Sequence, residues 1–443
     1  MELDFLRFFD ACDPSKTLAI ANPEDRQYYI DFASVRGGKI IEALQRTIVL
    51  RSRLNQPTCQ LFTGHIGCGK STELRRLQAD LETQGFHVVY FESTQDLDMA
   101  DVDISDILLA IIRQVTESLA DVGIQLKPRY FADRWQEMVD FLQTPLELSA
   151  EGNLPLPMKL GKITAKTKAS PSLRSRLRQY LEPRTSGILE SLNEEILARA
   201  NQELQRQGKK GLVVIVDNLD RVEDRRNEGG RTQPEYLFVD RGEQLRRLNC
   251  HLVYTIPLTL MFSNDYQALT NRFGGGVAPR VLPMVSVRSR DGKDNLAGMA
   301  LFRQLVLARA FPEIEPEARL DLVTQVFDSP ETLDRLCRMS GGHVRNLLGI
   351  IYTCLQEEDT PLSRNTIERA IRNYRDRLVS AITDNEWELL ADVVKQQNVS
   401  GEEGHDTLLR SLFVFEYQDE QGRWFAVNPV LRETEKFQRF CCK

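Results

Sequence analysis

The sequence lacks a long apolar run and an excess of positive charge. Of its 443 residues, no stretch approaches the ~18 consecutive apolar residues that a membrane-spanning helix requires. The opening, MELDFLR, has neither the basic start nor the apolar core of a signal peptide, so we expect none. The net charge of −7 gives no general attraction to nucleic acid or to an anionic membrane. We therefore expect a cytoplasmic protein with no membrane partner.

The sequence also lacks paired cysteines. Its eight cysteines are scattered, and none has the C-x-x-C spacing of a metal site. This usage is typical of a reducing compartment and indicates neither a zinc site nor a disulfide framework. A hydrophobic share of 42% and a charged share of 27% are those of an ordinary globular protein. The length allows two or three domains.

The sequence does contain one complete motif, a glycine-rich loop followed by a lysine and a serine. The phosphate-binding pattern G-x-x-x-x-G-K-[ST] is matched in full by Gly64-His65-Ile66-Gly67-Cys68-Gly69-Lys70-Ser71. Glycines allow the backbone to curl so that successive N–H groups face phosphate oxygens. Lys70 can reach the β- and γ-phosphates, and the Ser71 hydroxyl can ligate Mg²⁺.

The segments on both sides of the loop have the order that the motif requires. Residues 58–63 form a short, mostly apolar run that predicts a buried strand. Residues 71–81 predict a helix, which begins with Ser71 and Thr72 and whose N-terminal dipole favours an anion. We therefore predict a nucleotide site formed by residues 64–72, in place of a simple glycine turn.

A second motif lies far downstream. Residues 211–217 form a continuous apolar run that ends in Asp217, as expected of a parallel strand buried on both faces. Asp217 would then lie at the carboxyl edge of the sheet, where it can hold Mg²⁺ through water. Asp220 follows closely enough to orient or deprotonate an attacking water.

Together, the phosphate loop and the segment VDNLDR at residues 216–221 resemble the AAA+/STAND superclass of P-loop NTPases. The pattern is especially similar to the KAP-type and origin-recognition-type members. This resemblance implies an α/β fold, with a five-stranded parallel sheet sandwiched by helices. An all-α lid and a winged-helix-like C-terminal domain would follow. It also implies ATP and Mg²⁺ as ligands and a bacterial source.

The resemblance implies further site residues. Thr255, in the apolar run 251–257, matches the sensor-1 strand, and residues 281–287 would form the fifth strand. Arg272 stands where such proteins often carry an arginine finger that reaches a neighbour's γ-phosphate. Arg345, in the segment SGGHVRNL, matches the sensor-2 turn. The alternative interpretation of both arginines is a surface position without function.

One position departs from the family pattern. Many AAA+ ATPases place a glutamate directly after the magnesium aspartate, but here that residue is Asn218, which cannot accept a proton. The resemblance implies that Asp220 substitutes for it. We expect slow hydrolysis, because a well-placed base contributes roughly 10²–10⁴-fold. Slow hydrolysis favours a switch over a motor.

The expected domains are an N-terminal segment at 1–56, an NTPase core at 57–290, a helical lid at 291–378 and a winged-helix-like domain at 379–443. In the first of these, Tyr28, Tyr29 or Ile40 could pack on the adenine, or all three could be ordinary core residues.

The core is long because of an insertion at about 123–183. Within it, residues 161–171 predict a mobile basic loop, and a cluster of arginines follows at 174, 176, 178 and 184. This cluster could contact nucleic acid, an acidic partner or a neighbour's phosphates, or it could be a solvated helix face. An acidic loop at 96–103 and a charged loop at 223–234 complete the core.

The C-terminal helix–helix–hairpin pattern has few side chains that could contact DNA. Its candidate reading helix carries only Arg410, and the hairpin carries Glu416, Asp419 and Glu420. Major-groove readers need Arg, Lys, Asn or Gln on that helix. We therefore expect protein contact, and at most weak, sequence-independent DNA binding through the basic segment 162–184.

We conclude from the sequence that the chain is an ATP-binding and ATP-hydrolysing switch. Its nucleotide state would control homo-oligomerisation and an unidentified protein partner. A role in bacterial defence or stress signalling is implied by the resemblance alone. Two alternatives stay open: a DNA-transaction ATPase of the initiator or transposition-regulator type, and a module that binds nucleotide without turnover.

Overall fold

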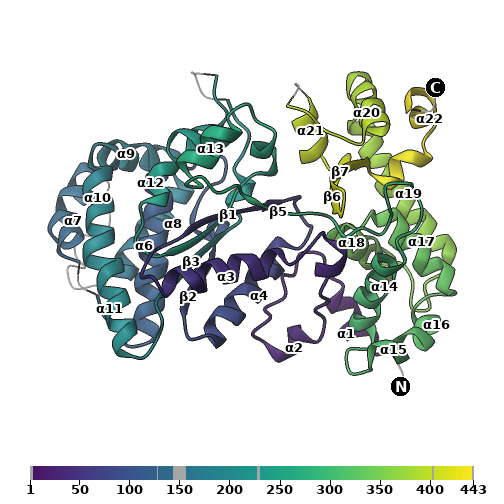
Figure 1. The fold of residues 1–443 in the computed structure, drawn as a ribbon, viewed down its shortest axis with the longest axis horizontal. Helices are drawn as coiled ribbons and strands as arrows, with labels where there is room; N and C mark the ends of the chain where they lie inside the picture. Colours follow the sequence, from purple (N-terminus) through teal and green to yellow (C-terminus); the bar gives the residue numbers. More distant parts are fainter. Residues whose placement is uncertain (1–2, 127, 143–155, 227–229, 402–403, 442–443) are drawn as a thin grey trace. The chain divides into compact units, whose positions relative to one another are not determined.

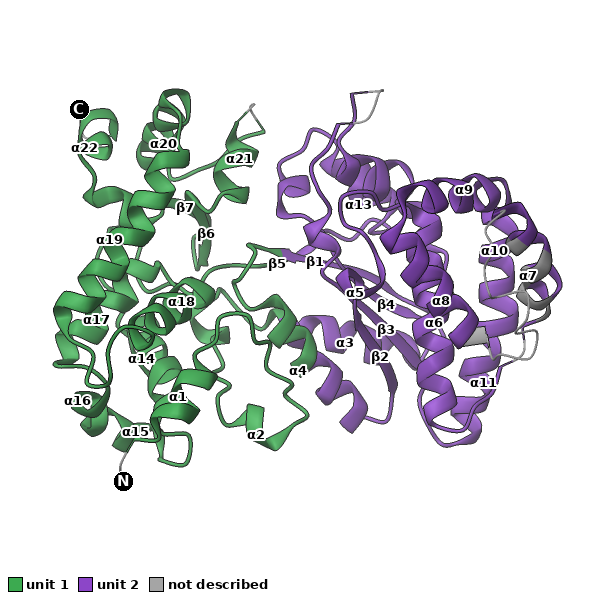
Figure 2. Cartoon of the chain, turned by 180° about the vertical axis from the view of Figure 1, so that it is seen from behind, with its two compact units in different colours: residues 1–40, 64–76, 281–443 green, residues 41–63, 77–280 purple. Residues whose placement is uncertain are grey.

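The structure is a computed structural model that describes residues 3–126, 128–142, 156–226, 230–401 and 404–441. Its elements are labelled in Figure 1. The chain forms two compact units, shown in two colours in Figure 2. Unit 1 comprises residues 1–40, 64–76 and 281–443, and unit 2 comprises residues 41–63 and 77–280. The four-part domain division expected from the sequence remains a prediction.

The centre of the fold is the predicted five-stranded parallel sheet, which is confirmed. Its strand order is β2-β3-β4-β1-β5, and the pairs β2–β3, β3–β4 and β4–β1 are parallel. The strands are β1 (Cys59–Gly64), β2 (His87–Glu92), β3 (Leu212–Asp217), β4 (His251–Thr255) and β5 (Arg280–Leu282).

Burial explains the composition of these strands. Every residue of β3 is buried, as is every residue of β4, which fits their near-continuous apolar sequences. Strand β5 is shorter than the expected strand at 281–287. Two backbone donors beyond it bind elsewhere in unit 1: Met284 N donates to the Glu416 carbonyl and Ser286 N to the Val35 carbonyl. Residues 283–287 therefore connect segments of unit 1 and do not extend the sheet.

Helices surround the sheet and fill the insertion. The long helix α6 begins with a capping box at Asp103, buries eleven residues and packs against β2, while α11 packs against β3. Helices that precede β3 are α1 (Phe5–Ala11), α2 (Pro23–Arg26), α3 (Ile40–Ser52), α4 (Lys70–Thr83), α5 (Ser93–Asp96), α6 (Ile104–Asp121), α7 (Arg129–Leu142), α8 (Leu156–Ala169), α9 (Pro171–Leu181), α10 (Thr185–Ser191) and α11 (Ala198–Arg206). Helices α12 (Gly242–Arg246) and α13 (Tyr266–Arg272) lie between β3 and β5.

The expected mobile basic loop at 161–171 is wrong: most of this segment is helix α8. Its buried face repeats at helical spacing through Leu160, Ile163, Thr164 and Thr167 and packs against α6. Both threonine hydroxyls donate to the carbonyl four residues earlier, at 2.8 and 3.0 Å. These internal hydrogen bonds let polar residues join an apolar face.

The arginine cluster of the insertion is bound within unit 2. Arg174 is buried and contacts Asp98 and Asp101 at 2.8 and 2.9 Å. Arg178 contacts Asp101 and Asp106 at 2.6 and 2.5 Å. The acidic loop and the basic helix α9 therefore neutralise each other, and neither arginine is available as a solvated patch. Residues 127, 143–155 and 227–229, which fall in the expected insertion and charged loop, lie outside the described residues.

Unit 1 contains the expected helical lid region. Helix α14 is one continuous helix, while residues 316–326 are divided into short helical turns. The helices of this region are α14 (Leu296–Ala310), α15 (Pro316–Arg319), α16 (Val323–Val326), α17 (Pro330–Ser340), α18 (Val344–Leu355) and α19 (Arg364–Ala381). Within the described ranges, no helix combines the length and apolar character that crossing a membrane requires.

The C-terminal part has the predicted helix–helix–hairpin order, with one more helix at its end. Its elements are α20 (Asp384–Gln396), α21 (His405–Arg410), β6 (Val414–Asp419), β7 (Gly422–Val427) and α22 (Glu435–Cys441). The candidate reading helix α21 has only six residues, half of them buried. Glu416, expected on the hairpin surface, is fully buried, and Asp419 pairs with Arg290 at 2.6 Å.

Candidate functional site

The phosphate-loop motif forms the connection between β1 and α4. Gly64, Gly67 and Gly69 all have positive φ, a conformation that residues with a Cβ rarely adopt. Lys70 is the first residue of the 14-residue helix α4, and its buried side chain bends back over the loop. Its Nζ donates to the carbonyls of Gly64 and His65 at 2.7 and 2.8 Å.

The next loop carbonyls are bound by donors from elsewhere in unit 1. His343 Nε2 donates to the Ile66 carbonyl at 2.8 Å, and the Arg345 backbone N–H donates to the Gly67 carbonyl at 3.2 Å. Arg36 Nη2 donates to the Cys68 carbonyl at 2.5 Å. These donors therefore hydrogen-bond the carbonyl oxygens of the loop on its outer side. This arrangement suits a loop whose N–H groups face an anion on the inner side. The backbone of Arg345 thus contacts the loop, and its role as the sensor-2 arginine remains a prediction.

The two histidines of this cluster are neutral. His343 Nδ1 accepts the Asn346 backbone N–H at 3.0 Å, so its proton is on Nε2. His65 Nε2 accepts the Glu416 backbone N–H at 2.9 Å, so its proton is on Nδ1. Burial lowers the pKa of His65 to about 3 and that of His343 to about 4. Phe415 packs against both rings, with centroids 5.9 and 5.8 Å away.

The hairpin strand β6 therefore touches the phosphate loop through Glu416. Neither carboxylate oxygen of Glu416 has a hydrogen-bond partner among the described residues, and Arg423 Nε lies 3.7 Å from Oε1. Burial raises the pKa of Glu416 to about 7, and the positive charge of Arg423 opposes this shift.

The N-terminal segment also contacts the loop and its helix. Tyr29 donates to the Glu73 carboxylate at 3.3 Å, and Arg36 lies 3.9 Å from the same carboxylate. Burial raises the pKa of Glu73, while the charges of Arg36 and Arg76 oppose the rise. Tyr28 instead accepts a hydrogen bond from Arg7 at 3.1 Å. The adenine contacts expected from Tyr28, Tyr29 or Ile40 remain predictions.

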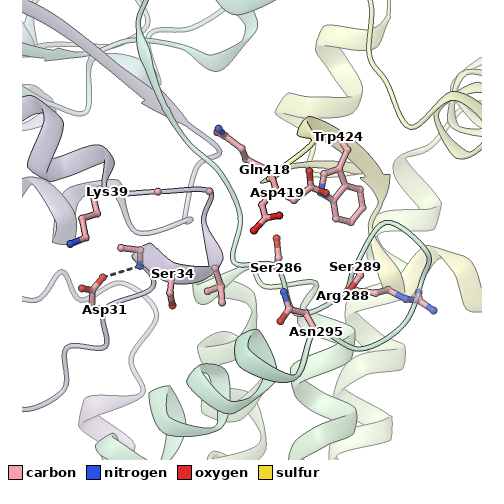
Figure 3. Close-up of a pocket in the computed structure, with 15 residues that line it drawn as sticks. Asp31, Ser34, Lys39, Ser286, Arg288, Ser289, Asn295, Gln418, Asp419 and Trp424 are labelled. Atoms are coloured by element: carbon pink, nitrogen blue, oxygen red, sulfur yellow. Dashed lines mark hydrogen bonds between the residues drawn. The ribbon is translucent and has the colours of Figure 1, made fainter.

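Unit 1 also has an open pocket of about 610 Å³ (Figure 3). Its walls come from the loop at 31–39, the connection at 286–295 and the β6–β7 hairpin. Figure 3 shows polar side chains from all three segments, among them Lys39, Asn295 and Asp419. No residue of the phosphate loop lines this pocket.

A second group of site residues lies at the carboxyl edge of the sheet in unit 2. Asp217 ends β3 and is fully buried. Its Oδ2 accepts the Tyr90 hydroxyl at 2.7 Å, and its Oδ1 accepts the Asn218 backbone N–H at 2.7 Å. Asn218 has φ 65°, in the left-handed region that asparagine tolerates better than most residues. Its Nδ2 donates to Glu92 Oε2 at 3.2 Å.

The three other expected site residues, Thr255, Asp220 and Arg272, also lie in unit 2. Thr255 ends β4, and its buried Oγ1 accepts the Leu219 backbone N–H at 3.0 Å, which holds the turn after Asp217. Asp220 lies in that turn, a 3₁₀ segment at Leu219–Arg221. Arg272 is exposed at the end of α13. Their roles with a nucleotide remain predictions.

A comparison with protein families bears on these residues. Residues 38–229, which include both the loop and Asp217, match the model of the KAP family P-loop domain. This segment is therefore similar to KAP-type P-loop NTPase domains, as expected from the sequence. The STAND assignment and the bacterial source remain predictions.

No curated protein matches the chain. Among solved structures, it is similar to the ORC2 protein of Aeropyrum pernix, with 13% identity, a TM-score of 0.43, and coverage of 100% of this chain and 99% of that one. It is also similar to Drosophila ORC bound to DNA, with 10% identity, a TM-score of 0.39 and coverage of 100% and 92%. A third is Cdc6p from Pyrobaculum aerophilum, with 11% identity, a TM-score of 0.36 and coverage of 94% and 98%.

Sequence reasoning missed two residues, Tyr90 and Glu92. Both lie on β2, which pairs with the strand that ends in Asp217. The available signal was the carboxylate at the end of β2, because ligand sites of open α/β sheets lie at the strand ends. Asn218 lacks the proton-accepting carboxylate of the glutamate that is common at this position. Its side chain instead donates a hydrogen bond to Glu92, which connects β2 to the residue that follows β3.

Proposed function

We propose that this chain is an ATP-binding and ATP-hydrolysing switch of the AAA+/STAND type. In this proposal, nucleotide state controls self-association and contact with a protein partner. The observation that carries the proposal is the set of donors on the phosphate loop. They come from the start of α18, from α4 and from Arg36 of the N-terminal segment, while β6 binds His65. A ligand in the loop would therefore act directly on the lid region and the hairpin. A role in defence or stress signalling is proposed from the family resemblance alone.

The residues present fit a magnesium nucleotide. Three glycines with positive φ, the start of a 14-residue helix and a buried lysine form an anion cradle. As ligands proposed from the sequence, Ser71 would offer a hydroxyl oxygen and Asp217 a carboxylate oxygen, which are ligand types that Mg²⁺ prefers. When bound, Mg²⁺ would neutralise charge on the phosphates.

Three further residues have proposed roles. Arg345, whose backbone contacts Gly67, would direct its guanidinium to the γ-phosphate. Thr255 would report on the turn after Asp217. Arg272 of a neighbouring copy would complete the site as an arginine finger, which explains why ATP should promote self-association.

A DNA-transaction role has less support. The net charge is −7, and Arg174 and Arg178, the centre of the basic cluster, are ion-paired to aspartates. Non-specific DNA affinity depends on free cations that displace counterions. We therefore propose that any DNA binding is weak and independent of sequence.

The experiment is a nucleotide titration of the wild-type chain and of Lys70→Ala, followed by sedimentation with ADP or a non-hydrolysable ATP analogue. We expect Lys70→Ala to lose affinity at least tenfold, because it deletes the cation that faces the phosphates. Lys293→Ala, an exposed lysine of unit 1, is the control and should bind normally. Equal affinity in Lys70→Ala, or a monomer in every nucleotide state, would contradict the proposal.

A further inference from the structure

The arginine that reaches the phosphate loop from the N-terminal segment of unit 1 is buried and held on several sides. The side chain of Arg36 is only 3% exposed, and its guanidinium carbon lies 5.2 Å from the centroid of the Phe32 ring. Its backbone N–H donates to the Ala33 carbonyl at 3.4 Å and closes the 3₁₀ turn at Ala33–Val35. Glu73, in the first turn of α4, supplies a negative charge 3.9 Å from Nη1. The guanidinium therefore faces the loop in a fixed orientation.

The target of this guanidinium is the peptide group between Cys68 and Gly69. Nη2 of Arg36 donates to the Cys68 carbonyl at 2.5 Å. The N–H of the same peptide belongs to Gly69, and it has no hydrogen-bond partner among the described residues. Because the C=O and N–H of a planar trans peptide point in opposite directions, a donor that fixes the carbonyl also fixes where the N–H points. A charged donor on the oxygen also polarises the N–H, since linked hydrogen bonds strengthen one another.

Gly69 depends on such support because its own backbone is permissive. It has φ +103°, and a residue without a Cβ can rotate its peptide at little steric cost. The carbonyl of Gly69 accepts the Glu73 backbone N–H at 3.1 Å, so the first turn of α4 holds the peptide that follows Gly69. Arg36 holds the peptide that precedes it. Loss of Arg36 would therefore free the Gly69 N–H to turn away from a phosphate.

We propose that Arg36 is a positioning residue for phosphate binding, which directs and polarises the Gly69 N–H through the Cys68 carbonyl. The assignment rests on the proposed function above, in which the N–H groups of the loop bind phosphate oxygens. Arg36 acts on the loop from its outer side and does not itself contact the ligand. Glu73 balances the guanidinium charge, so the burial of Arg36 does not depend on a bound phosphate.

The test measures the binding of inorganic pyrophosphate and of ATP, both with Mg²⁺, to the full-length chain by calorimetry. Pyrophosphate has no base or ribose, so its affinity reports on the phosphate loop alone. Arg36→Lys keeps the charge and a hydrogen-bond donor, while Arg36→Met keeps an apolar stem and removes both. The control Arg372→Met removes the same charge from an exposed position of α19.

We expect Arg36→Met to bind both ligands more weakly by the same factor, roughly 10–100-fold, the range of a hydrogen bond that involves a charged group. Arg36→Lys should bind them more tightly than Arg36→Met does, because it can still donate to the Cys68 carbonyl. Arg372→Met should match the wild type.

A spectroscopic measurement keeps the proposal testable if Arg36→Met does not fold. In protein labelled with nitrogen-15 glycine, the Gly69 amide nitrogen should move to lower chemical shift in Arg36→Lys, because the carbonyl of its peptide loses part of its polarisation. Gly208, an exposed glycine of unit 2 that also has positive φ, is the reference and should not move. An unchanged Gly69 resonance in a folded Arg36 variant would overturn the proposal.

The binding data could overturn the assignment in three ways. Wild-type affinity for pyrophosphate in Arg36→Met would show that the loop does not need the arginine. A loss of affinity for ATP but not for pyrophosphate would place Arg36 at the base or ribose. Equal losses in Arg36→Lys and Arg36→Met would show that neither charge nor donor matters. A wild-type chain that binds neither ligand, or a Lys70→Ala variant that binds both normally, would instead contradict the proposed function itself.

Discussion

The buried carboxylate of Glu416 should make the stability of the protein depend on pH. It is fully buried in β6, has no hydrogen-bond partner among the described residues and lies 3.7 Å from Arg423. Its pKa is raised to about 7 from the ordinary 4.5 because burial penalises the charged form. Replacing Glu416 with Gln keeps the shape of the side chain and removes the ionisation.

The direction and size of the effect follow from linkage. Because the folded pKa is the higher one, the stabilisation is fully present below pH 4.5 and is lost as pH rises through about 7. One pKa unit corresponds to about 1.4 kcal/mol, so the wild type should lose about 3 kcal/mol over this range. Glu416→Gln should not lose it. The variant should therefore gain about 3 kcal/mol relative to the wild type between pH 4.5 and pH 8.

The assay is urea unfolding followed by tryptophan fluorescence at pH 4.5, 6 and 8, which gives the free energy of unfolding at each pH. Trp424 stacks on Tyr417, a near neighbour of Glu416 on β6, so it reports on the hairpin. The matched control is Glu420→Gln, which removes the same charge from an exposed position in the hairpin turn. If the difference between Glu416→Gln and the wild type were the same at every pH, the argument from a buried, raised pKa would be refuted.

Two further substitutions test the packing of the site. Gly67→Ala should destabilise unit 1 by about 1–3 kcal/mol more than Gly208→Ala in a urea titration. Both glycines have φ near +80°, but a Cβ at Gly67 would lie 2.7 Å from His343 Cε1 while one at Gly208 meets nothing. Thr255→Val should cost about 1–3 kcal/mol by leaving the buried Leu219 N–H unpaired, whereas Thr255→Ser should retain most of that stability. An equal loss in Thr255→Ser would show that the methyl group and not the hydroxyl matters.

The parts of the fold that the sequence predicts correctly are those where local pattern and burial agree. β3 is apolar throughout because both of its faces are covered, and α14 follows its apolar repeat from Leu296 to Ala310. The phosphate loop is recognisable because its glycines must adopt positive φ and its lysine must follow them. In each case, one physical requirement determines several consecutive residues.

The sequence misleads where a residue's partner is remote or internal. The segment of helix α8 resembles a loop in the sequence because Thr164 and Thr167 are polar, although both hydroxyls bind carbonyls of the same helix. Arg174 suggested a basic surface because its aspartate partners are more than seventy residues away. Glu416 suggested an acidic surface, and nothing in its neighbourhood along the chain indicates that it is buried.

The contacts of the phosphate loop give a physical reason to connect nucleotide state with the C-terminal region. Successive carbonyls from Gly64 to Cys68 are bound by Lys70, His343, the Arg345 backbone and Arg36. Arg36, Lys70 and His343 are buried among packed side chains, so the loop cannot change its carbonyl directions without moving them. His65 adds a bond to β6 that exists only while its ring is neutral. A phosphate that pulled Lys70 away from two carbonyls would therefore disturb the same loop that holds the hairpin, and this coupling requires no long pathway through the protein.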